Sequence, residues 1–161
     1  MDALASKKGD AWVKISTQNF ISETEWMSKG LLAMGIQAGD KIATISNNRP
    51  EWNFVDFGIL QIGVVHVPIY PTISDNDYRF ILNDAEVKIV FVSDSALFSR
   101  IQSIRSEVPS IFEVYTFDQL PQAKHWRTIS DLGRQQDDAQ ILVKSKASIQ
   151  DDALATIIYT S

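Results

Sequence analysis

The hydroxyl-bearing residues at the carboxyl end of the sequence are the first that could do chemistry. A strand-like run from Ala155 to Ser161 ends in the hydroxyl-bearing pair Thr160 and Ser161. We expect this run to form a buried β-strand, and the carboxyl ends of strands in open α/β sheets are where ligand-binding loops begin. Hydroxyls at such a position can contact phosphate oxygens or a phosphate-bound Mg²⁺. The glycines that a phosphate-binding loop would need do not follow within the sequence, so the pattern alone does not identify a site.

The other candidate polar residues favour structural roles. His66 lies in an apolar run of strand length, where a histidine is more often a hydrogen-bonded core residue than a ligand. Arg49 precedes Pro50 and could reach an anion at a helix N-terminus, although a surface or capping role is more common. We expect Asp151 and Asp152 to be solvated turn residues and not metal ligands.

No complete catalytic set can be assembled from the sequence. It contains no recognisable Ser-His-Asp set, no His-x-x-x-His pair and no complete Gly-rich phosphate loop. Cysteine is absent, which excludes a disulfide framework, a thiolate metal site and a cysteine nucleophile. The two histidines, His66 and His125, are too few for most metal clusters.

Composition limits the class of protein. With 161 residues, 45% of them hydrophobic, the chain can bury one sizeable core but not two ordinary domains. Fifteen basic and 20 acidic residues give a net charge of −5 without a basic block, so nucleic acid is not an expected partner. No apolar run reaches the roughly 18 residues of a membrane span, and Met1 to Asp10 has no signal-peptide core. We therefore expect a cytoplasmic protein without a transmembrane segment.

Most of the sequence alternates between helix-period and strand-length patterns. Apolar positions three and four residues apart predict an amphipathic helix from Phe20 to Met34. The same criteria predict helices from Pro50 to Ile62, from the N-cap Ser74 to Ala85, and from Leu97 to Ile104. Strands are predicted at Lys41–Ser46, Val64–Ile69, Lys88–Val92 and Ile111–Thr116. The aromatic residues of the second helix, Trp52, Phe54 and Phe57, are interpreted as core and groove residues.

These elements predict a doubly wound α/β fold with a mostly parallel sheet and helices on both faces. The strand Lys88–Val92 is apolar on both of its faces, which is typical of a parallel sheet covered by crossover helices. Pro68 is expected to mark the end of its strand or an edge of the sheet. The polar stretch from Phe117 to Asp152 is interpreted as a surface connection with little core and one helix around Ile129 to Gln135. No second domain is predicted within residues 1–161.

Three segments, taken in order and with their spacing, resemble the N-terminal region of AMP-forming acyl-CoA synthetases. They run from Gly35 to Ala43, from Asn48 to Trp52 and from Gly63 to Thr72. The last two look more like the long-chain fatty acyl-CoA synthetase branch than the acetyl, aryl or peptide-synthetase branches. The sequence from Ile157 to Ser161 looks like the opening of that superfamily's phosphate loop, Y-T-S-G-T-T-G-x-P-K-G. The resemblance is good from Trp12 to Val92, thin from Phe117 to Ser148, and resumes at Asp151.

The resemblance implies an enzyme that uses ATP and Mg²⁺ to convert a fatty acid to an acyl adenylate and then transfers the acyl group to coenzyme A. It implies that Tyr159, Thr160 and Ser161 begin the ATP phosphate loop, with Thr160 near the Mg²⁺. The other catalytic parts of such enzymes lie further along the chain. We therefore expect these residues to be an inactive piece of the large N-terminal domain, cut before the first loop glycine and prone to self-association through an exposed sheet edge. Peripheral membrane contact by the longer enzyme stays open.

Two alternatives also stay open. The chain could be a non-catalytic α/β binding or interaction module, which tight ATP binding by these residues alone would favour. The longer protein could instead be another adenylating enzyme, such as a fatty acyl-AMP ligase or an aryl-CoA ligase. Pocket residues beyond Ser161 would be needed to separate these enzymes.

Overall fold

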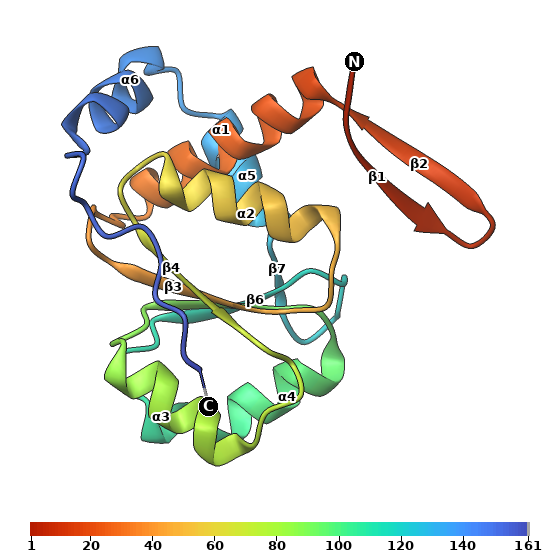
Figure 1. The fold of residues 1–161 in the computed structure, drawn as a ribbon, viewed down its shortest axis with the longest axis vertical. Coiled ribbons are helices and arrows are strands. Elements are labelled where there is room, and N and C mark those ends of the chain that lie inside the picture. The colour runs from red at the N-terminus through yellow and green to blue at the C-terminus, as the bar shows by residue number, and fades with distance from the viewer. Residues whose placement is uncertain (161) are drawn as a thin grey trace.

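The computed structural model describes residues 1–160 as a five-stranded sheet with surrounding helices and a separate two-stranded hairpin (Figure 1). The hairpin strands are β1 (Asp2–Lys8) and β2 (Ala11–Ser16). The sheet strands are β3 (Lys41–Ile45), β4 (Val65–Ile69), β5 (Ile89–Val92), β6 (Glu113–Thr116) and β7 (Lys124–His125). The helices are α1 (Thr17–Ala33), α2 (Pro50–Leu60), α3 (Asp75–Asp84), α4 (Ser95–Ile104), the 3-10 helix η1 (Arg105–Glu107), α5 (Arg127–Arg134) and α6 (Ala139–Ser148).

The sheet is parallel throughout and has the strand order β4-β3-β5-β6-β7. Ala43 of β3 pairs with Val67 of β4 on one side and with Val90 of β5 on the other. The chain therefore passes from β3 to β4, crosses back over β3 to β5, and continues outward to β7. This order reverses between β3 and β5, and it confirms the predicted doubly wound α/β fold.

Helices cover both faces of the sheet (Figure 1): α1, α2 and α5 lie on one face, and α3 and α4 lie on the other. The side chains of β5 show how the faces differ. Ile89 and Phe91 are buried in the core under α1 and α2, whereas Val90 and Val92 are buried in the core under α3 and α4. Alternate side chains of a strand point to opposite faces, so a strand covered on both sides must be apolar at every position.

Local signals begin three of the helices: α2 and α3 start as the sequence predicts, whereas α1 begins at Thr17, three residues before the predicted Phe20. The Ser16 hydroxyl accepts a hydrogen bond from the Asn19 N–H at the start of α1, and Pro50 is the first residue of α2, where its missing N–H costs nothing. At α3, the Ser74 hydroxyl accepts from the Asp77 N–H while the Asp77 carboxylate accepts from the Ser74 N–H. This reciprocal arrangement is a capping box.

The prediction of little core between Phe117 and Asp152 is wrong. This stretch contains β7, α5 and α6, and it contributes the buried side chains of Trp126, Ile129 and Leu142 to the core under α1 and α2. The expected helix around Ile129 corresponds to α5. Trp126 and Ile129 are three residues apart, but the residues around them are mostly polar, so the local pattern is too short to indicate a core. Their packing against α1 and α2 reveals them as core residues.

The hairpin of β1 and β2 was not predicted either. Its strands are mostly exposed, and their register pairs Leu4 with Ile15 and Ser6 with Val13. Gly9 adopts a left-handed backbone conformation (φ +59°) in the turn. The pair Gly9 and Asp10 between two alternating runs is the sequence signal that could have identified the hairpin.

The prediction of a buried strand over Ala155–Ser161 is wrong for its described part. Only Thr156 forms a β-bridge, to His66 of β4, and Ile158 is 64% exposed. Ser161 lies outside the described residues. Pro68 provides the physical reason, because it lacks the N–H with which β4 would continue the ladder along this edge. The prediction that Pro68 marks an edge is confirmed, since β4 is the edge strand of the five-stranded sheet.

Two glycines allow α1 and α5 to cross in direct contact. A Cβ atom added at Gly30 of α1 would overlap the carbonyl oxygen of Ile129, and one added at Gly133 of α5 would overlap the carbonyl oxygen of Trp26. Both obstacles are main-chain atoms that cannot rotate away. The close approach buries Ile129 completely against α1.

We expect Gly30→Ala to lower the free energy of unfolding by about 2 kcal/mol or more, because overpacking against a fixed main chain outweighs the helix propensity gained. Intrinsic propensity alone would favour alanine by about 0.5–1 kcal/mol. Urea denaturation measures the difference. Ser103→Ala, at an exposed position of α4, is the control and should stay within about 0.5 kcal/mol of the unsubstituted chain. A Gly30→Ala chain as stable as the control would contradict this account of the crossing.

Candidate functional site

The segment that precedes the predicted phosphate-loop residues lies along the outer edge of β4 (Figure 1). The His66 N–H donates to the carbonyl oxygen of Ala155 at 2.9 Å, and the Ile157 N–H donates to the carbonyl oxygen of His66 at 2.9 Å. The Thr156 hydroxyl also donates to the His66 carbonyl at 2.9 Å. The segment is therefore attached to the sheet through one residue of β4.

Tyr159 then brings the segment against α3. Its hydroxyl donates to the Asp84 carboxylate at 2.6 Å, and its ring meets the ring of Phe80 edge to face with centroids 6.2 Å apart. Burial and the hydrogen bond to Asp84 raise the pKa of Tyr159 to about 12. Thr160 follows with an exposed side chain, while Ser161 lies outside the described residues. Of the three predicted site residues, the structure thus places two at this edge of the sheet.

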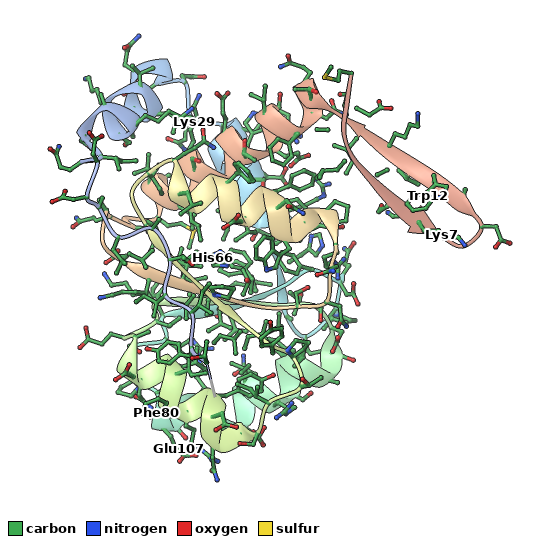
Figure 2. The ribbon with its side chains drawn as sticks, viewed as in Figure 1. Lys7, Trp12, Lys29, His66, Phe80 and Glu107 are labelled. Carbon is green, nitrogen blue, oxygen red and sulfur yellow. The ribbon has the colours of Figure 1, made fainter. Side chains whose placement is uncertain are left out.

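His66 occupies the interior next to the same segment (Figure 2). Its side chain is 2% exposed and lies between Asp56 of α2 and Thr44 of β3, with the Trp52 ring 5.1 Å away. The Nδ1–Asp56 Oδ1 distance is 2.6 Å and the Nε2–Thr44 Oγ1 distance is 2.7 Å. An ionised carboxylate can only accept, so Nδ1 carries the hydrogen, and a neutral ring then accepts from the Thr44 hydroxyl at Nε2.

This Asp-His-Thr order is that of a hydrolytic triad, in which a hydroxyl nucleophile contacts a histidine oriented by a carboxylate. Burial excludes that chemistry here. Thr44 is completely buried and His66 is 1% exposed, so no substrate carbonyl can approach the hydroxyl. The interpretation of His66 as a hydrogen-bonded core residue is confirmed.

Arg49 connects three loops at the carboxyl ends of the strands. Its guanidinium donates to Glu51 at 3.0 Å, to Asp118 after β6 at 3.0 Å, and to the Ser93 carbonyl after β5 at 3.3 Å. Burial raises the pKa of Glu51, but the hydrogen bond from Arg49, a main-chain hydrogen bond and the charges of Arg49 and Lys8 together outweigh this effect, so the pKa of Glu51 is lowered on balance. These contacts give Arg49 a structural role beside the point where the strand order reverses, but not the expected surface or capping role, because its side chain makes no cap hydrogen bond at the start of α2.

An open groove of about 940 Å³ separates the hairpin from the start of α2, a feature that sequence reasoning missed. Two lysines of β1, Lys7 and Lys8, stand on its hairpin side, and Arg49, Glu51 and Asp118 stand opposite. The groove joins segments far apart in the sequence, so no local pattern indicates it.

Within residues 1–160, no three histidine or acidic side chains come close enough together to hold a metal ion. Asp151 and Asp152 lie in an exposed turn, which confirms their interpretation as solvated turn residues. No helix among these residues is both long and apolar enough to span a membrane. Phe54 is buried as expected, whereas Phe57 is 49% exposed.

We expect Tyr159 to titrate near pH 12 and Asp84→Asn to lower that pKa, because the change removes the charge that opposes phenolate formation. Burial, the larger cause, would remain, so the pKa should stay above its ordinary value near 10. The stability from this contact is complete below pH 10 and is lost as the pH rises through about 12.

An ultraviolet phenolate titration measures the effect, and Tyr159→Phe identifies the signal among the four tyrosines. Asp77→Asn, at the start of the same helix, is the control and should leave the Tyr159 titration unchanged. Equal Tyr159 titrations in the Asp84→Asn and unsubstituted chains would contradict the hydrogen bond.

Comparison with curated proteins relates the chain to acyl-CoA ligases. It is 30% identical over 151 residues to the long-chain-fatty-acid–CoA ligase FadD15 of Mycobacterium bovis, which covers 93% of this chain and 25% of that protein. It is 27% identical to the long-chain-fatty-acid–CoA ligase ACSBG2 of Xenopus laevis, covering 99% of this chain and 22% of that protein. The chain thus spans about a quarter of the length of these relatives.

Solved structures show the same fold. A fatty acyl-CoA synthetase from Mycobacterium tuberculosis superposes with a TM-score of 0.72 at 21% identity, covering 92% of this chain and 28% of that one. A coronafacic acid ligase from Pectobacterium brasiliense superposes with a TM-score of 0.75 at 20% identity, covering 91% of this chain and 29% of that one. The sequence model described as AMP-binding enzyme matches residues 1–161, in agreement with the resemblance found in the sequence. The chain belongs to the AMP-binding enzyme family.

Proposed function

We propose that this protein activates long-chain fatty acids with ATP and transfers the acyl group to coenzyme A in the cytoplasm. The family match along the whole chain, together with relatives named long-chain-fatty-acid–CoA ligases, carries the proposal. In this reaction the fatty carboxylate attacks the α-phosphate of ATP, and pyrophosphate leaves. The thiolate of coenzyme A then attacks the acyl carbonyl, and AMP leaves.

We assign ATP contact to the segment Tyr159–Ser161. The Thr160 side chain is exposed, so its hydroxyl is accessible to a phosphate oxygen. The Tyr159 hydroxyl is bonded to Asp84, so its role would be to place the main chain that leads to Thr160. A threonine hydroxyl suits Mg²⁺, but as a single donor it would leave most of the coordination to water and the nucleotide phosphates. When bound, the ion would offset the charge of the departing pyrophosphate.

We expect the 161-residue chain to show no fatty-acid-dependent ATP–pyrophosphate exchange, because its sequence contains no Gly-rich loop to hold the phosphates. Coding DNA read past Ser161 should continue with Gly-Thr-Thr-Gly, and the protein expressed from it should exchange with palmitate and consume coenzyme A. Exchange by the 161-residue chain alone would contradict the first expectation.

The same assay separates the related reactions. Benzoate and acetate serve as control acids, and preference for benzoate would contradict the fatty-acid part of the proposal. Accumulation of acyl adenylate without consumption of coenzyme A would indicate an acyl-AMP ligase. A longer protein that activates no acid would contradict the catalytic proposal as a whole.

We also propose that the 161-residue chain self-associates through apolar side chains beside the β4 edge. Phe80, Leu154 and Ile158 are each more than half exposed there. Light scattering should show a mass that increases with concentration, and Ile158→Lys should reduce this increase. Val143→Lys on α6, at a similarly exposed valine, is the control and should not reduce it. A constant monomer mass at high concentration would contradict the proposal.

A further inference from the structure

The outer edge of β4 offers one main-chain donor to an incoming segment. Along a parallel strand, successive amides point to opposite sides. Val65 donates inward, to the Asp40 carbonyl at 2.8 Å, and His66 donates outward, to Ala155 at 2.9 Å. The next outward position is Pro68, which has no N–H. Within β4, all of which the structure describes, His66 is therefore the only residue with an outward N–H, and it determines the register of the terminal segment.

The side chain of this same residue is held from two directions. We call Asp56, His66 and Thr44, with their two hydrogen bonds of 2.6 and 2.7 Å, the polar clamp. Thr44 belongs to β3, which lies inside the sheet, and Asp56 belongs to α2, which covers the sheet. Removing any member would leave buried polar atoms without partners, so the three side chains restrict each other strongly.

We propose that the polar clamp positions the terminal segment, so that His66 is a positioning residue for the ATP-contacting residues that follow Ile157. The ring is held between β3 and α2. The main-chain N–H of the same residue donates to Ala155, and its carbonyl oxygen accepts from the Thr156 hydroxyl and the Ile157 N–H. The part of this inference that concerns ATP rests on the proposed function, whereas the part that concerns docking does not.

The first test is amide hydrogen exchange in the 161-residue chain. We expect His66→Phe, which keeps a ring but removes both ring hydrogen bonds, to speed exchange at Ile157 at least about tenfold more than at Phe91 of β5. The Tyr159 phenolate should at the same time titrate closer to its ordinary pKa, because the segment no longer holds it against Asp84. Equal acceleration at Ile157 and Phe91, with an unchanged Tyr159 titration, would show a purely structural role and overturn the proposal.

Two other variants keep the test decisive. Thr44→Val preserves shape and removes one hydrogen bond, so it replaces His66→Phe if that chain does not fold, with the same expected pattern. His125→Phe is the matched control, because His125 lies in β7 at the opposite edge and its ring contacts the Phe117 carbonyl at 2.9 Å. In the control, the ratio of the amide exchange rate at Ile157 to that at Phe91 should equal the ratio in the unsubstituted chain. Faster Ile157 exchange in the control as well would overturn the assignment to the clamp.

The part of the proposal that concerns ATP is tested by steady-state kinetics of the longer protein. Thr44→Val should raise the KM for ATP more than the KM for the fatty acid, since the clamp acts on the phosphate-binding segment. Equal changes in both constants would overturn this part. If the unsubstituted longer protein activates no acid, the proposed function fails, while the exchange data still decide whether the clamp positions the segment.

Discussion

Covering both faces of one parallel sheet is the constraint on which the rest of this structure depends. The strands β3 and β5 have neighbours on both sides and are buried on both faces, so each needs apolar side chains at nearly every position. Parallel neighbours can be joined only by crossovers, and α2, α3 and α4 are those crossovers. The result is two cores separated by the sheet, with the carboxyl ends of all five strands along one side.

Helix α2 is joined to this framework by polar contacts at three points along its length. At its start, Arg49 joins the loops after β5 and β6. In its middle, Asp56 reaches into the sheet to His66. Near its end, the carbonyl oxygen of Gly58 accepts from the buried Ser28 hydroxyl of α1 at 2.6 Å. Apolar packing alone would permit small shifts of a helix on a sheet, whereas buried polar groups that must keep their partners favour one position.

The proposed ATP contact depends on the edge of the sheet. An edge strand with free donors and acceptors along its length could pair with an added segment in several registers. Pro68 removes one outward donor of β4, which leaves His66 as the attachment point for the segment leading to Tyr159 and Thr160. The same residue that accepts the segment is bonded to the interior of the protein. Under the proposed function, this attachment places Tyr159 and Thr160 relative to the sheet.

The sequence by itself determined the fold class, because helix-period and strand-length patterns depend only on neighbouring residues. It also indicated the structural roles of His66 and Asp151, and the similarity to acyl-CoA synthetases. Exposed strands such as β1, and core residues as isolated as Trp126, escaped prediction because their stability comes from distant partners.

Only the tertiary structure decided which residues His66 contacts and how far the terminal strand extends. Asp56 and Thr44 are 10 and 22 residues away from His66 in the sequence, and Thr156 is 90 residues away. The apolar run before Thr160 has the composition of a buried strand, but whether it becomes one depends on the donors of the strand beside it. That neighbour is β4, and its Pro68 ends the ladder after one bridge. The pairing of a strand is a property of two segments, and a sequence pattern describes only one of them.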